Sequence, residues 1–159
     1  LAEKFDVAIC TENIEHVIDD RKLLKDIARC IKPGGRLLLT APNLLYVGMS
    51  RDDLGPFQTV ENGGHVRRGY NEAMLRELCQ EAKLVPNDFS YCSGFLSQKI
   101  TGLLRVISRI HPLLGWVCVL PLRILPPCLD GLITPIFSRP GFSICMEAYK
   151  PRFEVSNDI

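Results

Sequence analysis

Residues 5–17 read FDVAICTENIEHV and residues 32–43 read KPGGRLLLTAPN, with an amphipathic segment between them. The runs at 5–10 and 36–41 are short and apolar. Such runs are typical of strands that are covered on both faces, as in a parallel sheet. The intervening segment is long enough for the crossover helix that parallel strands require. The stretch therefore predicts an α/β unit of strand, loop, helix, tight turn and strand.

The predicted helix has recognisable ends. Asp19 or Asp20 can cap its first turn, because a short carboxylate accepts from free backbone N–H groups. Pro33-Gly34-Gly35 ends it. A Gly-rich turn holds phosphate where a helix begins after it, whereas here a strand follows, so we interpret the turn as a cap. The buried stripe falls at helical spacing and comprises Leu23, Leu24, Ile27, Ala28 and Ile31.

The sequence of this stretch resembles the second half of a class I S-adenosylmethionine-dependent methyltransferase that acts on small molecules. The resemblance rests on FDV at 5–7, ENIEHV at 12–17 and KPGG at 32–35. It implies a partial Rossmann-like methyltransferase sheet with the family's fourth to seventh strands, the last of them antiparallel near residues 141–149. Members also carry three earlier strands and a Gly-rich cofactor turn, but this sequence has no Gly-x-Gly-x-x-Gly. We expect residues 1–159 to form a single, truncated methyltransferase domain.

Composition sets outer limits on the function. The 159 residues are 47% hydrophobic and 23% charged, which is ordinary for a folded domain with a real core. A net charge of +1 indicates no general attraction to nucleic acid, and we expect no nucleic-acid partner. Seven cysteines without a Cys-x-x-Cys pair favour reduced thiols over a disulfide framework. We therefore expect a cytoplasmic protein.

The second half contains a helix at 71–83 and a strand at 87–95, by periodicity. The family usually has a glycine directly after that helix, but Lys83 stands there. If this position is left-handed, a residue with a side chain costs about 1 kcal/mol. Residues 44–69, rich in turn formers, predict a long loop, and long loops in compact domains are usually functional or mobile.

Residues 96–137 are strongly apolar, with arginines interspersed. A membrane span needs about 20 uninterrupted apolar residues, and this run is broken by Pro112, Pro121 and Arg123, so we reject a span. The segment predicts an apolar helical insertion. Three interpretations stay open: additional core, a lid over an apolar substrate pocket, or an interfacial element that makes peripheral membrane contact.

The resemblance implies S-adenosylmethionine as the cofactor. It also implies that Cys10, Thr11 and Glu12, at the end of the first strand, run under the methionine portion of the cofactor, largely through backbone groups. The carboxyl ends of strands are the usual place for ligands in open α/β sheets. A local cap is the alternative role for Glu12.

Glu12, Glu15 and His16 form a Glu-x-x-Glu-His pattern that can hold a divalent cation. It is similar to the metal-binding motif of ubiquinone-biosynthesis O-methyltransferases and of small-RNA 3′-terminal 2′-O-methyltransferases. His65 can supply another imidazole. The alternative is that His16 packs in the loop and bonds to backbone, as in relatives without a metal.

His65 and His16 are the candidate catalytic residues, because an imidazole readily accepts a proton near neutral pH. His65 is the better candidate base; its alternative role is to order the loop. Asn43, Arg67 and Tyr70 are candidate substrate-binding residues, since the family places this region over the active site.

The sequence thus predicts methyl transfer to a small, hydrophobic acceptor, with O-methylation favoured over transfer to carbon or nitrogen. An apolar insertion fits an apolar acceptor. Two alternatives remain. One is a non-catalytic methyltransferase-like fragment that acts as a binding or membrane-docking module. The other is an RNA 2′-O-methyltransferase, which the low net charge disfavours.

Overall fold

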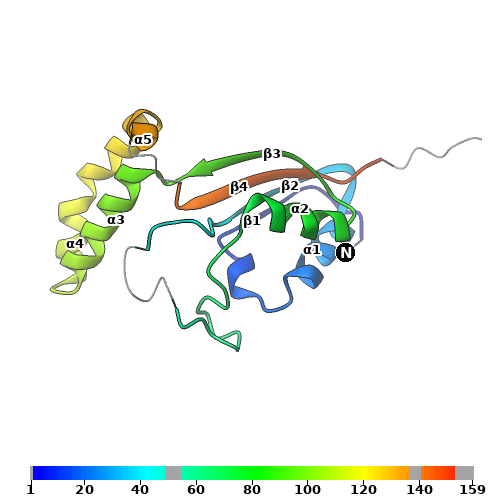
Figure 1. Ribbon diagram of the computed structural model, residues 1–159, viewed down its shortest axis with the longest axis horizontal. Helices are drawn as coiled ribbons and strands as arrows, with labels where there is room; N and C mark the ends of the chain where they lie inside the picture. Colours follow the sequence, from blue (N-terminus) through cyan, green and yellow to red (C-terminus); the bar gives the residue numbers. More distant parts are fainter. Residues whose placement is uncertain (1, 49–54, 137–140, 153–159) are drawn as a thin grey trace, which may run out of the picture.

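The computed structural model describes residues 2–48, 55–136 and 141–152. A four-stranded sheet and two helices form one end, and a group of helices forms the other (Figure 1). The strands are β1 (Phe5–Thr11), β2 (Ile31–Pro42), β3 (Val85–Cys92) and β4 (Ser143–Tyr149), in the order β1-β2-β4-β3. β1 and β2 are parallel, and β4 is antiparallel to both β2 and β3. The predicted mixed α/β sheet with an antiparallel last strand is confirmed.

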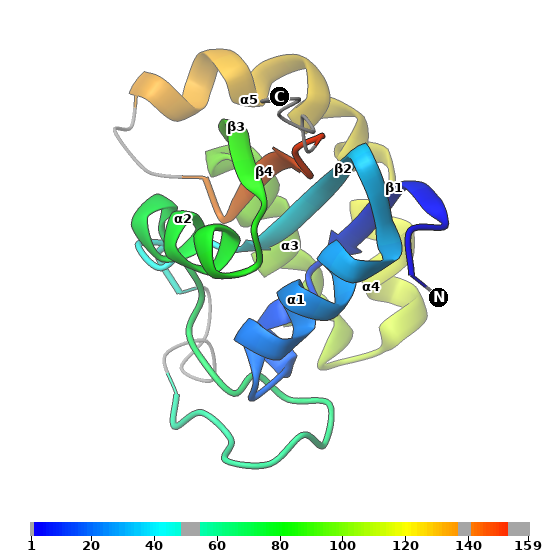
Figure 2. The same cartoon turned by 90° about the vertical axis from the view of Figure 1, so that its right-hand side faces the viewer.

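Helices α1 (Asp20–Cys30) and α2 (Glu72–Glu81) lie together on one face of the sheet (Figure 2). Their apolar stripes pack against alternate side chains of the central strands. Leu37 and Leu39 are buried on this face, while Leu38 between them is 40% exposed. Burial with a period of two is what one covered face requires. The core of this layer includes Leu24, Ala28, Leu75, Leu78, Cys79, Ala41, Ile144, Met146 and Ala148.

The other face of the sheet is open in the described residues. Ile9 is 70% exposed, and Tyr149 is 40% exposed. The sequence predicts cover on both faces, and the structure covers only one, because α1 and α2 pack on the same side. The apolar side chains of the second face therefore lack the partner that such runs normally have.

Several boundaries differ from the sequence prediction. β2 begins at Ile31 rather than at 36, with a register shift opposite Phe5 and Val7 that accommodates the Gly-Gly turn. β3 covers Val85–Cys92 rather than 87–95. Its Pro86 sits beside a register shift on an edge strand, where a proline is tolerated because no ladder donor is needed.

The second group of helices follows β3 and occupies the carboxyl end of the parallel strands (Figure 1). It consists of α3 (Phe95–Ser108), α4 (Pro112–Val119), η3 (Pro121–Ile124) and α5 (Leu125–Ile136), and we call it the helical module. It corresponds to the predicted insertion at 96–137, of which residue 137 lies outside the described residues. Phe95 begins a helix here and does not end a strand, because Gly94 and the side chain of Asp130 start α3.

Lys83 has φ = 57°, so the residue after α2 is left-handed, as the resemblance to the family suggested. The N–H of Leu84 donates to the carbonyl of Cys79 (2.9 Å), and the N–H of Lys83 donates to that of Gln80 (3.1 Å). This is the Schellman arrangement that usually takes glycine. The backbone thus keeps the reversal although the side chain disfavours it.

Candidate functional site

The carboxyl ends of the parallel strands open into a cavity of about 380 Å³ below α3. Glu12 stands at the end of β1 and Thr40 near the end of β2. Gln98, Thr101 and Arg105 of α3 face them across the cavity. The position is where open α/β sheets bind ligands. The rest of the wall consists of Cys92, Ser93, Ser97, Phe142 and Ser143.

Glu12 has φ = 46°, a left-handed conformation that is uncommon for a residue with a side chain. Its N–H donates to the carbonyl oxygen of Thr40 (2.9 Å), which fixes the backbone at the strand end. Strained backbone of this kind persists where the surroundings hold it and gathers at functional sites. Of the other predicted cofactor residues, Thr11 is exposed at the end of β1 and Cys10 is buried below it. Burial and the nearby carboxylate of Glu15 raise the pKa of Cys10.

The structure brings Glu15, His16 and His65 together. Their potential ligand atoms lie within 4.8 Å of one another. His16 and Glu15 belong to the short helix η1 (Ile14–His16), and the ring of His65 meets that of His16 edge to face at 4.7 Å. Main-chain bonds hold the loop in place, since the N–H of Val66 donates to the carbonyl of Glu15 (2.9 Å). Glu12 is not a member of this cluster, although the sequence groups it with Glu15 and His16.

Glu15 is the buried member of the cluster, only 1% exposed. Its Oε1 lies 3.7 Å from Nε2 of His16, and its Oε2 has no hydrogen-bond partner in the structure. Burial is the main cause that raises the pKa of this carboxyl. Nδ1 of His16 lies 3.0 Å from the carbonyl oxygen of Gly64 and therefore carries the hydrogen. This bond leaves Nε2 of the neutral ring as an acceptor beside the carboxylate.

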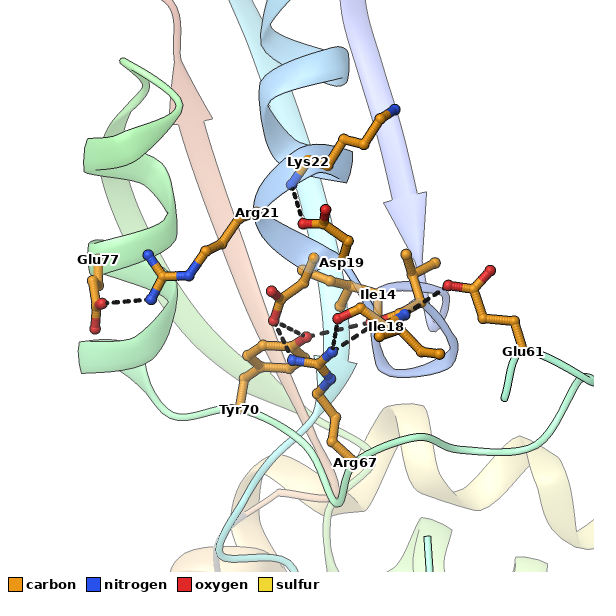
Figure 3. A network of polar contacts seen from close by, with 11 residues as sticks. Ile14, Ile18, Asp19, Arg21, Lys22, Glu61, Arg67, Tyr70 and Glu77 are labelled. Carbon is orange, nitrogen blue, oxygen red and sulfur yellow. Dashed lines mark hydrogen bonds and ion pairs between the residues drawn. The ribbon is translucent and has the colours of Figure 1, made fainter. Parts of the chain in front are cut away.

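Arg67 and Tyr70 join the loop to the start of α1 (Figure 3). Arg67 donates to Asp20 and to the carbonyl oxygens of Val17 (2.8 Å) and Ile18 (2.7 Å). The fully buried Tyr70 hydroxyl donates to Asp20 Oδ2 at 2.9 Å. Burial is the main cause that raises the pKa of Tyr70. We call Arg67, Tyr70 and Asp20 the loop latch.

Asn43 is also engaged within the protein. Its side chain donates to the carbonyl oxygen of Gly141 (3.2 Å) and accepts from the N–H of Leu45 (3.0 Å). The three candidate substrate-binding residues thus have internal partners that hold loops around the strand ends. Their roles as substrate ligands stay predictions.

Sequence reasoning missed the polar lining that α3 contributes. Gln98, Thr101 and Arg105 recur at spacings of three and four, which puts them on one helix face within an otherwise apolar run. That spacing was available as a signal. Asp20 was expected only as a cap. The cap is Asp19, which accepts from the N–H of Lys22 (2.8 Å), and this leaves Asp20 to bind Arg67.

A family model described as a methyltransferase domain matches residues 1–85, just over half of the chain. The ubiquinone biosynthesis O-methyltransferase of Coxiella burnetii (strain RSA 493 / Nine Mile phase I) is 43% identical over 42 residues. Those residues are 26% of this chain and 18% of that enzyme.

Solved structures share the fold. One, assigned provisionally as a sarcosine dimethylglycine methyltransferase from Galdieria sulphuraria, has a TM-score of 0.58 at 16% identity, over 94% of this chain and 54% of its own. Phosphoethanolamine N-methyltransferase 2 of Haemonchus contortus, in complex with phosphomonomethylethanolamine and S-adenosylhomocysteine, has a TM-score of 0.54 at 17% identity, over 96% and 34%. The 4+2 cyclase SpnF has a TM-score of 0.52 at 18% identity, over 94% and 52%. The chain spans about half or less of each of these proteins.

Proposed function

Because this chain belongs to the family of methyltransferase domains, we propose that the complete protein transfers a methyl group from S-adenosylmethionine to a hydroxyl oxygen of a small acceptor with an apolar portion. The observation that carries the proposal is the cavity at the carboxyl ends of β1 and β2, walled by Glu12 and Thr40. The cavity lies at the end of the first strand, where the resemblance to methyltransferases implies that the cofactor binds. The short match to an enzyme that methylates oxygen supports the choice of acceptor atom.

In this proposal the chain supplies half of the cofactor site. Residues 10–12 hold the methionine portion of S-adenosylmethionine mainly by backbone groups, and the left-handed Glu12 turns the chain away at the strand end. The open face of the sheet, with Ile9 exposed, is covered by other segments of the complete protein. Methyl transfer from a sulfonium to an acceptor oxygen is an in-line displacement in which the thioether leaves, so the protein's main task is to align donor and acceptor.

His65 and His16 are the proposed proton acceptors for the hydroxyl. Both belong to the cluster with Glu15, and the bond of His16 to Gly64 leaves its Nε2 able to take a proton. The buried carboxylate of Glu15, 3.7 Å from that nitrogen, would stabilise the resulting imidazolium. His65 lies on the loop that the latch holds, so its position depends on Arg67 and Asp20.

The same cluster fits a divalent cation. It offers two imidazoles and one carboxylate, and Glu15 Oε2 is a buried oxygen without a partner, which is the sort of atom that a bound cation satisfies. A mixed nitrogen and oxygen donor set suits a transition metal better than Mg²⁺. When bound, the cation would lower the pKa of a coordinated hydroxyl. Calorimetric titration with Mn²⁺ and Zn²⁺ tests this directly: binding that His65→Ala and Glu15→Gln both weaken supports the site, and unchanged binding in both variants contradicts it.

The acceptor class is tested with the complete protein, labelled S-adenosylmethionine and two panels of acceptors. One panel holds lipophilic phenols and quinols, and the other holds polar amines. We expect turnover with the first panel and an O-methylated product by mass spectrometry. Turnover with the amines alone would contradict the proposal.

The second candidate is a methyltransferase-like module without methyl transfer. The specific observation in its favour is the fold shared with a cyclase, because one fold can host different reactions. Under this alternative, the complete protein methylates no acceptor in either panel, and S-adenosylmethionine is recovered unchanged.

A further inference from the structure

The outer surface of the helical module is unusually apolar. Ile110 is 80% exposed, Ile136 76%, Ile124 72%, Val117 71% and Leu113 70%. These side chains come from α4, η3 and α5 and from the turn between α3 and α4. Extended apolar surfaces on a folded protein mark contact with a partner or a membrane.

Helix α4 is an exposed, apolar element of this surface. Its sequence PLLGWVCV contains no charged side chain, yet only Gly115 and Val119 are buried. A helix that is apolar all round is normally enclosed in a core or in lipid. The inner contact of α4 is with α3, where Gly115 allows close approach to Ser108. Apart from Gly115 and Val119, the side chains of α4 are exposed, although Arg123 of η3 lies over the ring of Trp116.

The charges around this surface indicate what covers it. Lys99, Arg109 and Arg123 are exposed on the module. Asp130 is the only acidic residue in 95–136, and it is turned inward: its carboxylate accepts from the N–H groups of Leu96 (2.7 Å) and Ser97 (3.1 Å) at the start of α3. The outer surface therefore combines apolar side chains with cations alone. A second copy of the chain would bring these cations against one another, whereas anionic lipid headgroups would neutralise them.

Trp116 supports the same occupant. It is 48% exposed, and the guanidinium of Arg123 lies 5.0 Å from its ring centre. Tryptophan beside a basic residue suits the boundary between headgroups and acyl chains, where one part of the side chain is wet and the other is apolar.

We propose that the helical module docks on an anionic membrane surface, with Leu113, Trp116 and Val117 in the headgroup–acyl boundary and Arg109 and Arg123 against lipid phosphates. In the described residues no single helix is both long and apolar enough to cross a membrane. The pair Pro112–Val119 and Pro121–Ile136, bent by 42°, meets that requirement when taken together, by length and composition only. Docking of this kind depends on apolar area together with attraction to anionic lipid. It goes beyond the proposed methyl transfer and does not depend on it.

The test is co-sedimentation of the intact protein with phosphatidylcholine vesicles, with and without phosphatidylglycerol. We expect binding to the anionic vesicles. Each basic residue near such a surface contributes about fivefold, so Arg109→Glu/Arg123→Glu weakens binding by roughly 30-fold or more. The matched control, Lys4→Glu/Lys83→Glu, makes the same charge change on exposed residues at the amino ends of the strands and leaves binding unchanged.

The apolar contribution is tested with Leu113→Ser/Val117→Ser, which we expect to weaken binding at least tenfold while circular dichroism stays unchanged, because both side chains are exposed. Absence of binding to anionic vesicles by the unaltered protein would overturn the proposal. Equal binding to neutral vesicles would overturn it too. So would self-association in solution that the serine variant abolishes, since the surface would then belong to a second copy.

Discussion

Replacement of Arg67 by alanine should release the loop that carries His65. Arg67 is bonded to Asp20 and to the carbonyl oxygens of Val17 and Ile18 (Figure 3). Its side chain is 27% exposed and that of Asp20 13% exposed, so the pair is partly shielded from water. After the change, Asp20 keeps only the Tyr70 hydroxyl as a side-chain donor among the bonds described above.

The magnitude follows from these contacts. A hydrogen bond to a charged group contributes about 1.5–3 kcal/mol when it is shielded. Loss of one partner of a buried pair costs roughly 3–5 kcal/mol. Partial exposure reduces both figures through solvent screening. We expect Arg67→Ala to lower the free energy of unfolding by about 2 kcal/mol, and Arg67→Lys by less, since lysine keeps the charge but not the planar fork.

Two assays read out this change. Urea unfolding followed by circular dichroism gives the global loss. Hydrogen exchange at the Val66 amide, which donates to the carbonyl of Glu15, gives the local one. A loss of 2 kcal/mol in local opening corresponds to roughly 30-fold faster exchange at that amide. The matched control is Arg21→Ala, because Arg21 is 49% exposed and forms surface ion pairs with Glu77 (2.9 Å) and with Glu81, whose side chains are 62% and 30% exposed.

Exposed ion pairs contribute about 0–1 kcal/mol to stability, so Arg21→Ala should change the free energy of unfolding and the exchange rate of the Val66 amide little. The reasoning is refuted if Arg67→Ala and Arg21→Ala have equal, small effects on unfolding and on the Val66 amide.

Three further changes test the backbone and the packing. Lys83→Gly should raise the free energy of urea unfolding by about 0.5–1 kcal/mol, because it relieves a left-handed side chain; a loss of stability would contradict this. Burial raises the pKa of Cys79 from 9.0 to about 11, so the folded state keeps a proton that the unfolded state loses, and stability should fall as pH rises through this range. Urea unfolding of Cys79→Ala should show a shallower fall above pH 9, and an identical fall would exclude the thiol as its cause. Gly115→Ala should destabilise the helical module by about 1 kcal/mol, since an added Cβ meets Ser108 Oγ at 2.3 Å and, once that hydroxyl rotates away, still lies 3.1 Å from the backbone nitrogen of Ser108. Gly102→Ala, with nothing within 4 Å of the added Cβ, should not destabilise it, and unfolding followed by Trp116 fluorescence measures both variants.

Local signals in the sequence predict much of this fold. The apolar runs at 5–10 and 36–41 become parts of β1 and β2, and the stripe from Leu23 to Ala28 becomes the buried side of α1, whereas Ile31, predicted in the same stripe, is the first residue of β2. The left-handed Lys83 also follows from where the family places a glycine. These features depend on residues that are close in the chain, so they can be predicted from the local pattern of residue types.

Features that depend on distant contacts were beyond sequence reasoning. Asp20 and Arg67 are 47 positions apart, and nothing local distinguishes Asp20 from Asp19 as the partner of the guanidinium. The start of β3 at Val85 was missed because Pro86 disfavours a strand, and pairing with β4 overrides that preference. Likewise the sequence groups Glu12 with Glu15 and His16, but the left-handed turn at Glu12 removes it from the cluster that His65 completes.

The central claim is that the end of β1 is part of a site for S-adenosylmethionine, and isothermal titration of the complete protein with this cofactor tests it most directly. The account predicts saturable binding by the unaltered protein and by Glu12→Gly, which keeps the left-handed backbone. It predicts binding about tenfold weaker for Glu12→Val, because a β-branched residue disfavours φ = 46° by roughly 1–2 kcal/mol. No binding by the unaltered protein, or equal binding by the glycine and valine variants, would contradict it.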